Sequence, residues 1–174
     1  MKFKLLLSFL LLLSTQVFGQ LSFDGTVNYI EDKMNECDGL RWTYSSPSFY
    51  RYSKLQFGVR SDDKSKLIIN LTRTYADESV EEVQYIFDPT HIKTFAYQSN
   101  TSELTPTELI YVYMNGSTVI VITKKNGVQT ETNSASFVIP YLKYDPLNKE
   151  RMSMAFLLLK KLAIAKKGSD PFAN

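Results

Sequence analysis

The chain has 174 residues, of which 44% are hydrophobic and 22% charged, with 11 Tyr, 11 Phe and one Trp. This length and aromatic content suit one globular domain with a packed core and exclude a disordered chain. The formal net charge of +2 gives no support for a general polyanion-binding protein.

The N-terminus has the pattern of a secretory signal peptide, which we predict over residues 1–19. Two lysines precede an apolar run from Leu5 to Leu13, and a small-residue junction follows at Gly19. The apolar run is shorter than the ~20 residues of a membrane-spanning helix. No Cys follows the junction as a lipid-attachment site would require. We therefore expect a secreted or periplasmic protein that begins near Gln20.

Residues 20–145 are expected to form an antiparallel β domain, because apolar and polar side chains alternate along most of this segment. Clusters of Asp, Pro and Ser, as in "SDDKS", "ADES" and "DPTH", separate the alternating runs and are typical of turns. We expect strands in FDGTVNY (23–29), LRWTY (40–44), KLQFGVR (54–60), LIINLTRTY (67–75), VEEVQYIF (80–87) and IKTFAY (92–97).

Two Asn-Gly pairs give the strongest local signals in the second half of this domain. Asn115-Gly116 and Asn126-Gly127 both lie between apolar or β-branched runs. Because Asn and Gly adopt positive φ at little cost, each pair predicts a tight hairpin, so that three strands follow one another in a meander. Strands at 109–114 and 118–123 are apolar on both faces, which predicts that both faces are covered.

The last long segment predicts a helix over residues 146–168, followed by a short tail at 169–174. Asp145 is a suitable N-cap, Pro146 suits the first helical position, and Gly168 suits the end. Apolar side chains cover more than half of the helical wheel, with Lys149, Ser153, Lys160 and Lys167 on the opposite side.

This wide apolar face predicts a helix packed in the core. The uninterrupted apolar stretch from Ala155 to Leu159 is far shorter than a membrane span. Lysines flank the apolar face, so contact of this helix with a membrane surface is the less favoured alternative. The basic residues of this tail and the acidic balance of the preceding domain also favour packing of the tail on the domain.

The resulting fold class is mainly β (α+β). We expect an antiparallel meander of about eight or nine strands that forms a strongly bent sheet, a half-barrel or a closed barrel, packed by one C-terminal helix. A meander followed by a helix resembles the lipocalin-type barrels in architecture, although Trp42 follows Leu40-Arg41 and the G-x-W start motif of that family is missing. The resemblance implies a ligand held by the sheet.

Residues suited to catalysis or metal binding are scarce. The only His and the only Cys are His91, in a turn-like segment, and Cys37, which we expect to be a free or loosely buried thiol at a turn. Neither lies in a nucleophile motif, and one His with one Cys cannot form a usual zinc site. Gly-rich phosphate loops are also missing from the sequence. We therefore expect no enzymatic activity, no metal and no cofactor.

An aromatic stretch over residues 40–54 is the best candidate for ligand contact. Exposed rings there would form a stacking platform for sugars, whereas rings turned inward would be ordinary strand residues of the core. The candidate contact residues are Trp42, Tyr44, Tyr50 and Tyr52 in this stretch and Tyr111 and Tyr113 further along the chain.

Three functions follow as hypotheses. The first is a secreted binding protein that holds a small apolar or amphipathic ligand in the bent sheet. The second is an extracellular or envelope module that acts through its surface, as a structural or protein-interaction unit without a ligand. The third is carbohydrate contact through the aromatic stretch Trp42–Tyr52. The expected partners are a small hydrophobic ligand or a protein, and nucleic acid is not expected.

Overall fold

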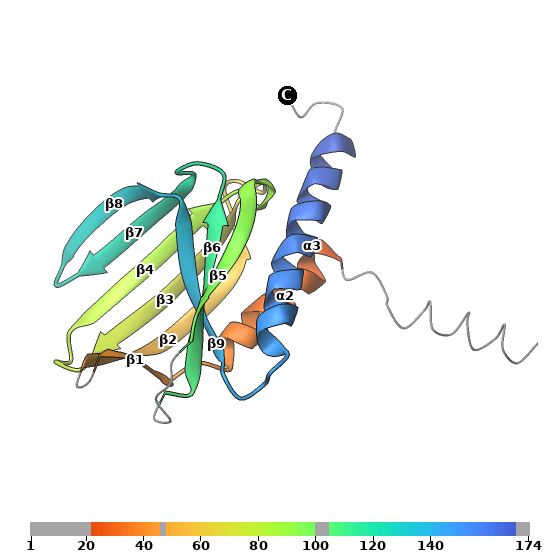
Figure 1. Ribbon diagram of the computed structural model, residues 1–174. Coiled ribbons are helices and arrows are strands. Elements are labelled where there is room, and N and C mark those ends of the chain that lie inside the picture. Colours follow the sequence, from red (N-terminus) through yellow and green to blue (C-terminus); the bar gives the residue numbers. More distant parts are fainter. Residues whose placement is uncertain (1–21, 46–47, 100–104, 170–174) are drawn as a thin grey trace, which may run out of the picture.

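The computed structural model describes residues 22–45, 48–99 and 105–169. Helix α2 (Phe23–Asn35) comes first, then nine strands interrupted by the short 3-10 helix η1 (Pro89–His91), and helix α3 (Asn148–Ser169) ends the described chain (Figure 1). The strands are β1 (Arg41–Ser45), β2 (Ser48–Val59), β3 (Leu67–Tyr75), β4 (Val80–Phe87), β5 (Ile92–Gln98), β6 (Thr107–Met114), β7 (Val119–Lys125), β8 (Val128–Ser134) and β9 (Ser136–Leu142).

All described strand pairs are antiparallel and form two sheets, a six-stranded one in the order β1-β2-β3-β4-β7-β8 and a three-stranded one in the order β5-β6-β9. Three strands of the larger sheet continue into the smaller one, because β4 leads to β5, β7 follows β6, and β8 is separated from β9 by Ala135 alone. The bend between the two sheets forms a corner. There, the main-chain amide of Met114 donates a hydrogen bond to the carbonyl of Ala135 (2.7 Å), and the amide of Asn115 donates to the carbonyl of His91 (2.8 Å). The two sheets are thus halves of one strongly bent sheet, as predicted, and among the described strands this sheet does not close into a barrel.

The two Asn-Gly pairs have different structures, and the prediction of a hairpin at Asn115-Gly116 is wrong. Asn126 and Gly127 both have positive φ (53° and 79°), and Lys125 pairs with Val128 across this tight turn. At the other pair only Gly116 has positive φ (73°). Strands β6 and β7 do not pair there; residues 115–118 instead carry the chain around the corner from one sheet to the other.

The prediction of a strand over residues 23–29 is also wrong, because these residues belong to helix α2. Ser22 caps the helix, and its hydroxyl accepts a 3.0 Å hydrogen bond from the amide of Gly25. Buried residues follow at helical spacing, namely Thr26, Val27, Ile30 and Met34. The alternation of apolar residues ends at Tyr29, whereas the helical period continues to Met34, and packing of that longer face decides the local structure.

Helix α3 confirms the predicted C-terminal helix, but only one side of it is buried. Asp145 accepts a bond from the amide of Leu147 (3.0 Å), just ahead of the first turn. Two lysines that the helical wheel placed on the solvent side, Lys160 and Lys167, reach back to the corner of the sheet instead. The buried side consists of Met152, Ser153, Ala155, Phe156, Leu159 and Ala163, while Leu147, Met154, Leu157 and Ile164 are exposed.

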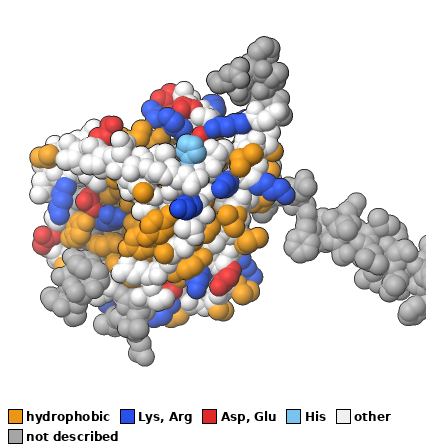
Figure 2. Space-filling model, turned by 45° about the horizontal axis from the view of Figure 1, so that its top comes forward, with side chains coloured by type: hydrophobic (Ala, Val, Ile, Leu, Met, Phe, Trp, Pro, Cys, Tyr) orange, Lys and Arg blue, Asp and Glu red, His pale blue; other side chains and the backbone are white. Residues whose placement is uncertain are grey.

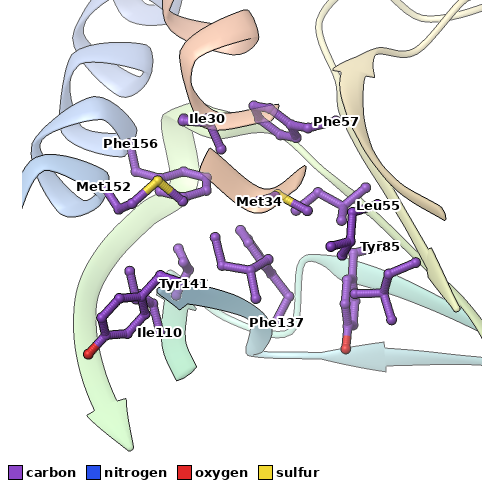
Figure 3. Packing of buried hydrophobic residues seen from close by; sticks show 14 of the residues in the cluster. Ile30, Met34, Leu55, Phe57, Tyr85, Ile110, Phe137, Tyr141, Met152 and Phe156 are labelled. Carbon is purple, nitrogen blue, oxygen red and sulfur yellow. The ribbon is translucent and has the colours of Figure 1, made fainter. Parts of the chain in front are cut away.

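The core lies inside the bend, between the two sheets and the two helices (Figure 3). Aromatic rings fill its centre. The ring of Phe137 in β9 stacks on Phe87 of β4 at a centroid distance of 4.4 Å and meets Phe156 of α3 at 5.9 Å. Ile30 and Met34 of α2 complete this layer beside the strands. The expectation that both faces of 118–123 are covered is wrong, because residues 120–123 are only half-buried.

Candidate ligand-binding groove

An open groove of about 760 Å³ crosses the six-stranded sheet. Its polar lining residues alternate along β3 and β4 with the core residues, so the groove lies on the sheet face opposite to the core. The lining residues are Asn35 and Asp38 after α2, Lys54, Leu55 and Gln56 of β2, Asn70, Leu71 and Thr72 of β3, Glu82, Val83 and Gln84 of β4, Ile122 and Lys124 of β7, and Gln129 of β8.

A row of amide side chains runs across the groove. Gln56, Asn70 and Gln84 are direct neighbours on three adjacent strands. Gln84 Nε2 donates to Asn70 Oδ1 (2.9 Å), and Asn70 Nδ2 approaches Gln56 Oε1 at 3.4 Å. These contacts fix which amide atoms face each other. The remaining amide donors and acceptors can therefore offer a fixed hydrogen-bond pattern to a ligand.

A second row lies beside the first and contains charges. Thr72, Glu82 and Lys124 are opposite one another on β3, β4 and β7. The ammonium of Lys124 and a carboxylate oxygen of Glu82 are 3.7 Å apart, and both side chains are about half exposed. An exposed ion pair of this kind contributes little to stability, so either charge can turn toward a ligand at small cost. Thr72 on β3, which is next to Glu82, is buried.

A bulge in β2 forms one end of the groove. The pairing register of β2 with β3 shifts between Ser53 and Gln56, and Lys54 has a positive φ of 53°. The amide of Lys54 donates to Asp38 Oδ1 (3.0 Å), which ties this irregular backbone to the segment after α2. The bulge therefore holds an acidic and a basic residue together at the rim.

The residues predicted from the sequence as ligand contacts lie elsewhere. Trp42, Tyr50 and Tyr52 are buried on the core side, and the hydroxyls of the two tyrosines are 3.1 Å apart. Tyr111 is half-buried and donates to Gln98 Oε1 (2.7 Å), while Tyr113 is 38% exposed. The side chain of Tyr44 lies outside the described residues. Trp42, Tyr50 and Tyr52 thus turn their rings inward, which was the structural alternative to a stacking platform, while Phe49 of the same stretch is half-buried beside Arg41.

Tyr50 and Tyr52 belong to a polar cluster around Arg73 inside the bend. Arg73 donates to Glu81 (3.1 Å) and to the hydroxyl of Tyr85 (3.1 Å). Burial disfavours the charged guanidinium, but the surrounding tyrosines and Glu81 outweigh it and raise the pKa of Arg73. The guanidinium also lies 5.5 Å from the ring centre of Tyr50. This cluster is an ion pair enclosed by aromatic packing, so we interpret it as a structural feature.

Tyr75 completes this cluster at its edge. Its hydroxyl donates to Glu81 (2.8 Å), and the ammonium of Lys125 lies 4.3 Å from its ring centre. Burial and the neighbouring carboxylate raise the pKa of Tyr75 to about 12. The phenol therefore stays protonated and keeps donating its hydrogen bond over the physiological pH range.

Cys37 and His91, the residues with the most reactive side chains, do not line the groove. Cys37 is buried beside α2, and burial raises the pKa of its thiol, which disfavours the reactive thiolate. His91 is exposed in η1, at the corner of the bent sheet. Within the described ranges, no group of three or more His, Cys, Asp or Glu side chains is arranged to hold a metal ion. The described helices also include none long and apolar enough to cross a bilayer.

Sequence alone did not identify the groove because it depends on strand register. Asn70, Thr72, Glu82 and Gln84 are the polar members of two alternating strands, a pattern that ordinary solvent-facing residues share. The rows exist only when β2, β3, β4 and β7 are aligned. Comparison of the chain with protein-family models, curated proteins and solved structures found no significant match.

Proposed function

We propose that this chain is a non-catalytic binding protein that holds a small amphipathic ligand in the groove of the six-stranded sheet. The supporting observation is the ordered amide row of Gln56, Asn70 and Gln84 across an open groove of about 760 Å³. Binding sites of this size commonly combine apolar surface with a few fixed polar groups. The proposed ligand therefore lies outside the bend, whose interior is packed with aromatic rings.

The mixed lining supports an amphipathic ligand. Ile122, which is half-buried, continues the amide row on β7 next to Gln84, whereas the other three apolar residues that border the groove, Leu55, Leu71 and Val83, belong to the core. Apolar atoms of a ligand can displace water from Ile122 and from the stem of Lys124, while its polar atoms bind the amides and the Glu82–Lys124 pair. A fully apolar ligand would leave the amide groups without partners, which costs binding free energy.

The location of the protein is part of the proposal. The leader pattern over residues 1–19 supports export, so the ligand would be met outside the cytoplasm. Trp42, Tyr50 and Tyr52 face the core, and Phe49 is half-buried beside Arg41, so this stretch gives little support to sugar stacking. A surface module that binds another protein remains a separate candidate, because α3 exposes several large apolar side chains.

Amide chemical shifts of isotope-labelled protein test the ligand site. The probes are octyl glucoside, decanoate and lysophosphatidylcholine, three amphipathic molecules with different head groups, with glucose as a head group alone. We expect at least one amphipathic probe to shift the signals of Asn70 and Gln84 and glucose to shift them less. The double variant Asn70→Ala/Gln84→Ala should weaken this binding, and Asn28→Ala, an exposed amide on α2, should leave it unchanged. Shifts that avoid the groove for all probes, or that survive the double variant, would overturn the proposal.

A further inference from the structure

The outward side of α3, together with Leu147 directly before its first residue, carries four large apolar side chains without any cover in the described part of the chain. Leu147, Met154, Leu157 and Ile164 are 53%, 64%, 41% and 51% exposed. The helix runs along the right-hand side of Figure 1, and the same side of Figure 2 shows hydrophobic side chains at the surface among basic ones. A helix that is apolar on both sides is usually covered on both sides.

The spacing of these residues is that of a coiled-coil seam. Leu147, Met154, Leu157 and Ile164 follow one another at intervals of seven, three and seven residues. Alternating steps of three and four residues place two more residues in the same row, Glu150 and Lys161. Both are exposed, and within the described residues neither side chain forms an ion pair. The seam of α3 therefore contains four apolar positions and one charge of each sign.

We propose that the seam of α3 binds the same seam of a second copy of this chain, with the two helices antiparallel. A twofold axis midway between Ala155 and Phe156 places Leu147 opposite Ile164 of the second copy and Met154 opposite Leu157 of the second copy. The same axis places Glu150 opposite Lys161 of the second copy, and this pair occurs twice. The seam is thus complementary to itself in both apolar contacts and charge.

The two charged positions select this arrangement over others. A parallel pair in register would place Glu150 against Glu150 and Lys161 against Lys161 of the second copy, which is repulsive. Sliding the antiparallel pair by one heptad in either direction would place Glu150 against Met154 or Lys161 against Leu157 of the second copy, leaving a charge against an apolar residue. Charged seam positions weaken association but specify register and orientation.

The interface is small, which sets the expected strength. The seam spans 18 residues, from Leu147 to Ile164, a length of about 26 Å along the helix axis. A single pair of helices of this length is at the low end of specific interfaces, so we expect a weak dimer that forms at high protein concentration and dissociates on dilution. The seam is on a different element from the groove, so the dimer is independent of ligand binding.

Sedimentation of the protein as purified from the cell, together with its charge variants, tests the dimer. E150K and K161E each place like charges opposite one another, so each should raise the dimer dissociation constant by roughly tenfold or more. The double variant E150K/K161E restores opposite charges and should restore the dimer. An equimolar mixture of E150K and K161E should also form a dimer, because every charged pair in the mixed dimer is then opposite in sign. Both variants change exposed residues, and circular dichroism checks that they are folded.

Two results would overturn the proposal. One is a chain that stays monomeric at high concentration, and the other is a dimer that the single charge variants leave unaffected. Co-sedimentation with vesicles of phosphatidylglycerol separates the membrane-surface alternative. If the monomer binds these anionic vesicles and K161E abolishes that binding while no dimer is found, the seam faces lipid and the self-association model is wrong.

Discussion

The ammonium group of Lys160 in α3 donates a 2.6 Å hydrogen bond to the main-chain carbonyl of Ile92, the first residue of β5. About two turns further along the helix, Lys167 forms a 2.6 Å ion pair with Asp88, just before η1. Both contacts are at the corner where β4 passes into β5. The C-terminal half of α3 is therefore attached to the bend itself, and the lysines expected on the solvent side of the helix have a structural role.

The Lys167–Asp88 pair makes part of the stability depend on pH. Burial of Asp88 alone would raise its pKa, but Lys167 and the bonds from Thr90 outweigh this and lower it. Because the pKa of Asp88 is lower in the folded chain than its ordinary value of about 3.9, the carboxylate stabilises the fold above that value. This contribution is lost as the pH falls through the lowered pKa.

We predict that Asp88→Asn lowers the free energy of unfolding by about 1 kcal/mol at neutral pH, through loss of the ion pair and weakening of the cap on η1. Below the pKa of Asp88 the variant and the natural chain should have similar stability. Urea unfolding at neutral and strongly acidic pH measures both values. Asp62→Asn is the control, because Asp62 pairs with Arg60 at an exposed site. An Asp88→Asn deficit of the same size at both pH values would contradict the prediction.

The two Asn-Gly pairs allow a direct comparison of one residue type in two backbone conformations. Asn126 has a φ of 53°, where an alanine is strained, whereas Asn115 is not among the residues with positive φ. We predict that Asn126→Ala costs about 1 kcal/mol of unfolding free energy and that Asn115→Ala costs less than about 0.5 kcal/mol. Thermal or urea unfolding of both variants gives the comparison. Equal costs would mean that the turn at Asn126 is not held in the left-handed conformation.

The same comparison shows how far the sequence predicts this fold. Strand positions, the tight turn at Asn126-Gly127 and the C-terminal helix follow from local patterns. The turn at Asn115-Gly116 has the same local pattern, but its structure depends on β4 and β5, which form the corner beside it. The amide row of Asn70 and Gln84 likewise depends on pairing between strands. Such long-range register is not visible in a local sequence pattern.

Arg73 and Glu81 provide a test of a nearly buried ion pair. Their side chains are 15% and 17% exposed, and the Arg73 Nε atom is buried without a hydrogen-bond acceptor among the described residues. Removing one member leaves the other charge poorly solvated among tyrosines. We predict that Arg73→Leu and Glu81→Leu each lower the unfolding free energy by about 2–3 kcal/mol.

The double variant Arg73→Leu/Glu81→Leu should be less destabilised than the sum of the two single variants, because it leaves no unpaired charge in the bend. Urea unfolding of all four proteins gives this coupling. Strictly additive losses would show that the two side chains act independently, in conflict with the 3.1 Å contact.

Cys37 reports on unfolding because its thiol is buried. Burial raises the pKa of this thiol, and the residue has no exposed surface. We predict that a thiol-reactive disulfide reagent at about pH 8 modifies the folded chain only at the rate at which the protein opens. Addition of urea should make the reaction fast and complete. Rapid modification without denaturant would show that the segment after α2 opens independently of the rest of the fold.

Two leucines of α3 lie on opposite sides of the helix, one on the buried side and one in the exposed seam. Leu159 is fully buried against the core, whereas Leu157, two residues earlier, is 41% exposed. We predict that Leu159→Ala lowers the unfolding free energy by about 3 kcal/mol, because it removes core packing and leaves a cavity. Leu157→Ala should cost less than about 0.5 kcal/mol at protein concentrations where the chain is monomeric. Urea unfolding followed by circular dichroism measures both changes.

Ending the chain at Tyr144 is the extreme form of the same test. It removes Met152, Phe156 and Leu159 together and exposes the aromatic rings of the bend, including Phe137, which packs against Phe156. At about 1.5–3 kcal/mol each, the loss of these three side chains costs roughly 5–9 kcal/mol, which is comparable with the total stability of a typical domain, so the truncated chain should be unfolded or insoluble. A truncated chain that stays folded with an unchanged melting transition would mean that α3 does not belong to the core. In that case Leu159→Ala should be as harmless as Leu157→Ala, and the two results check each other.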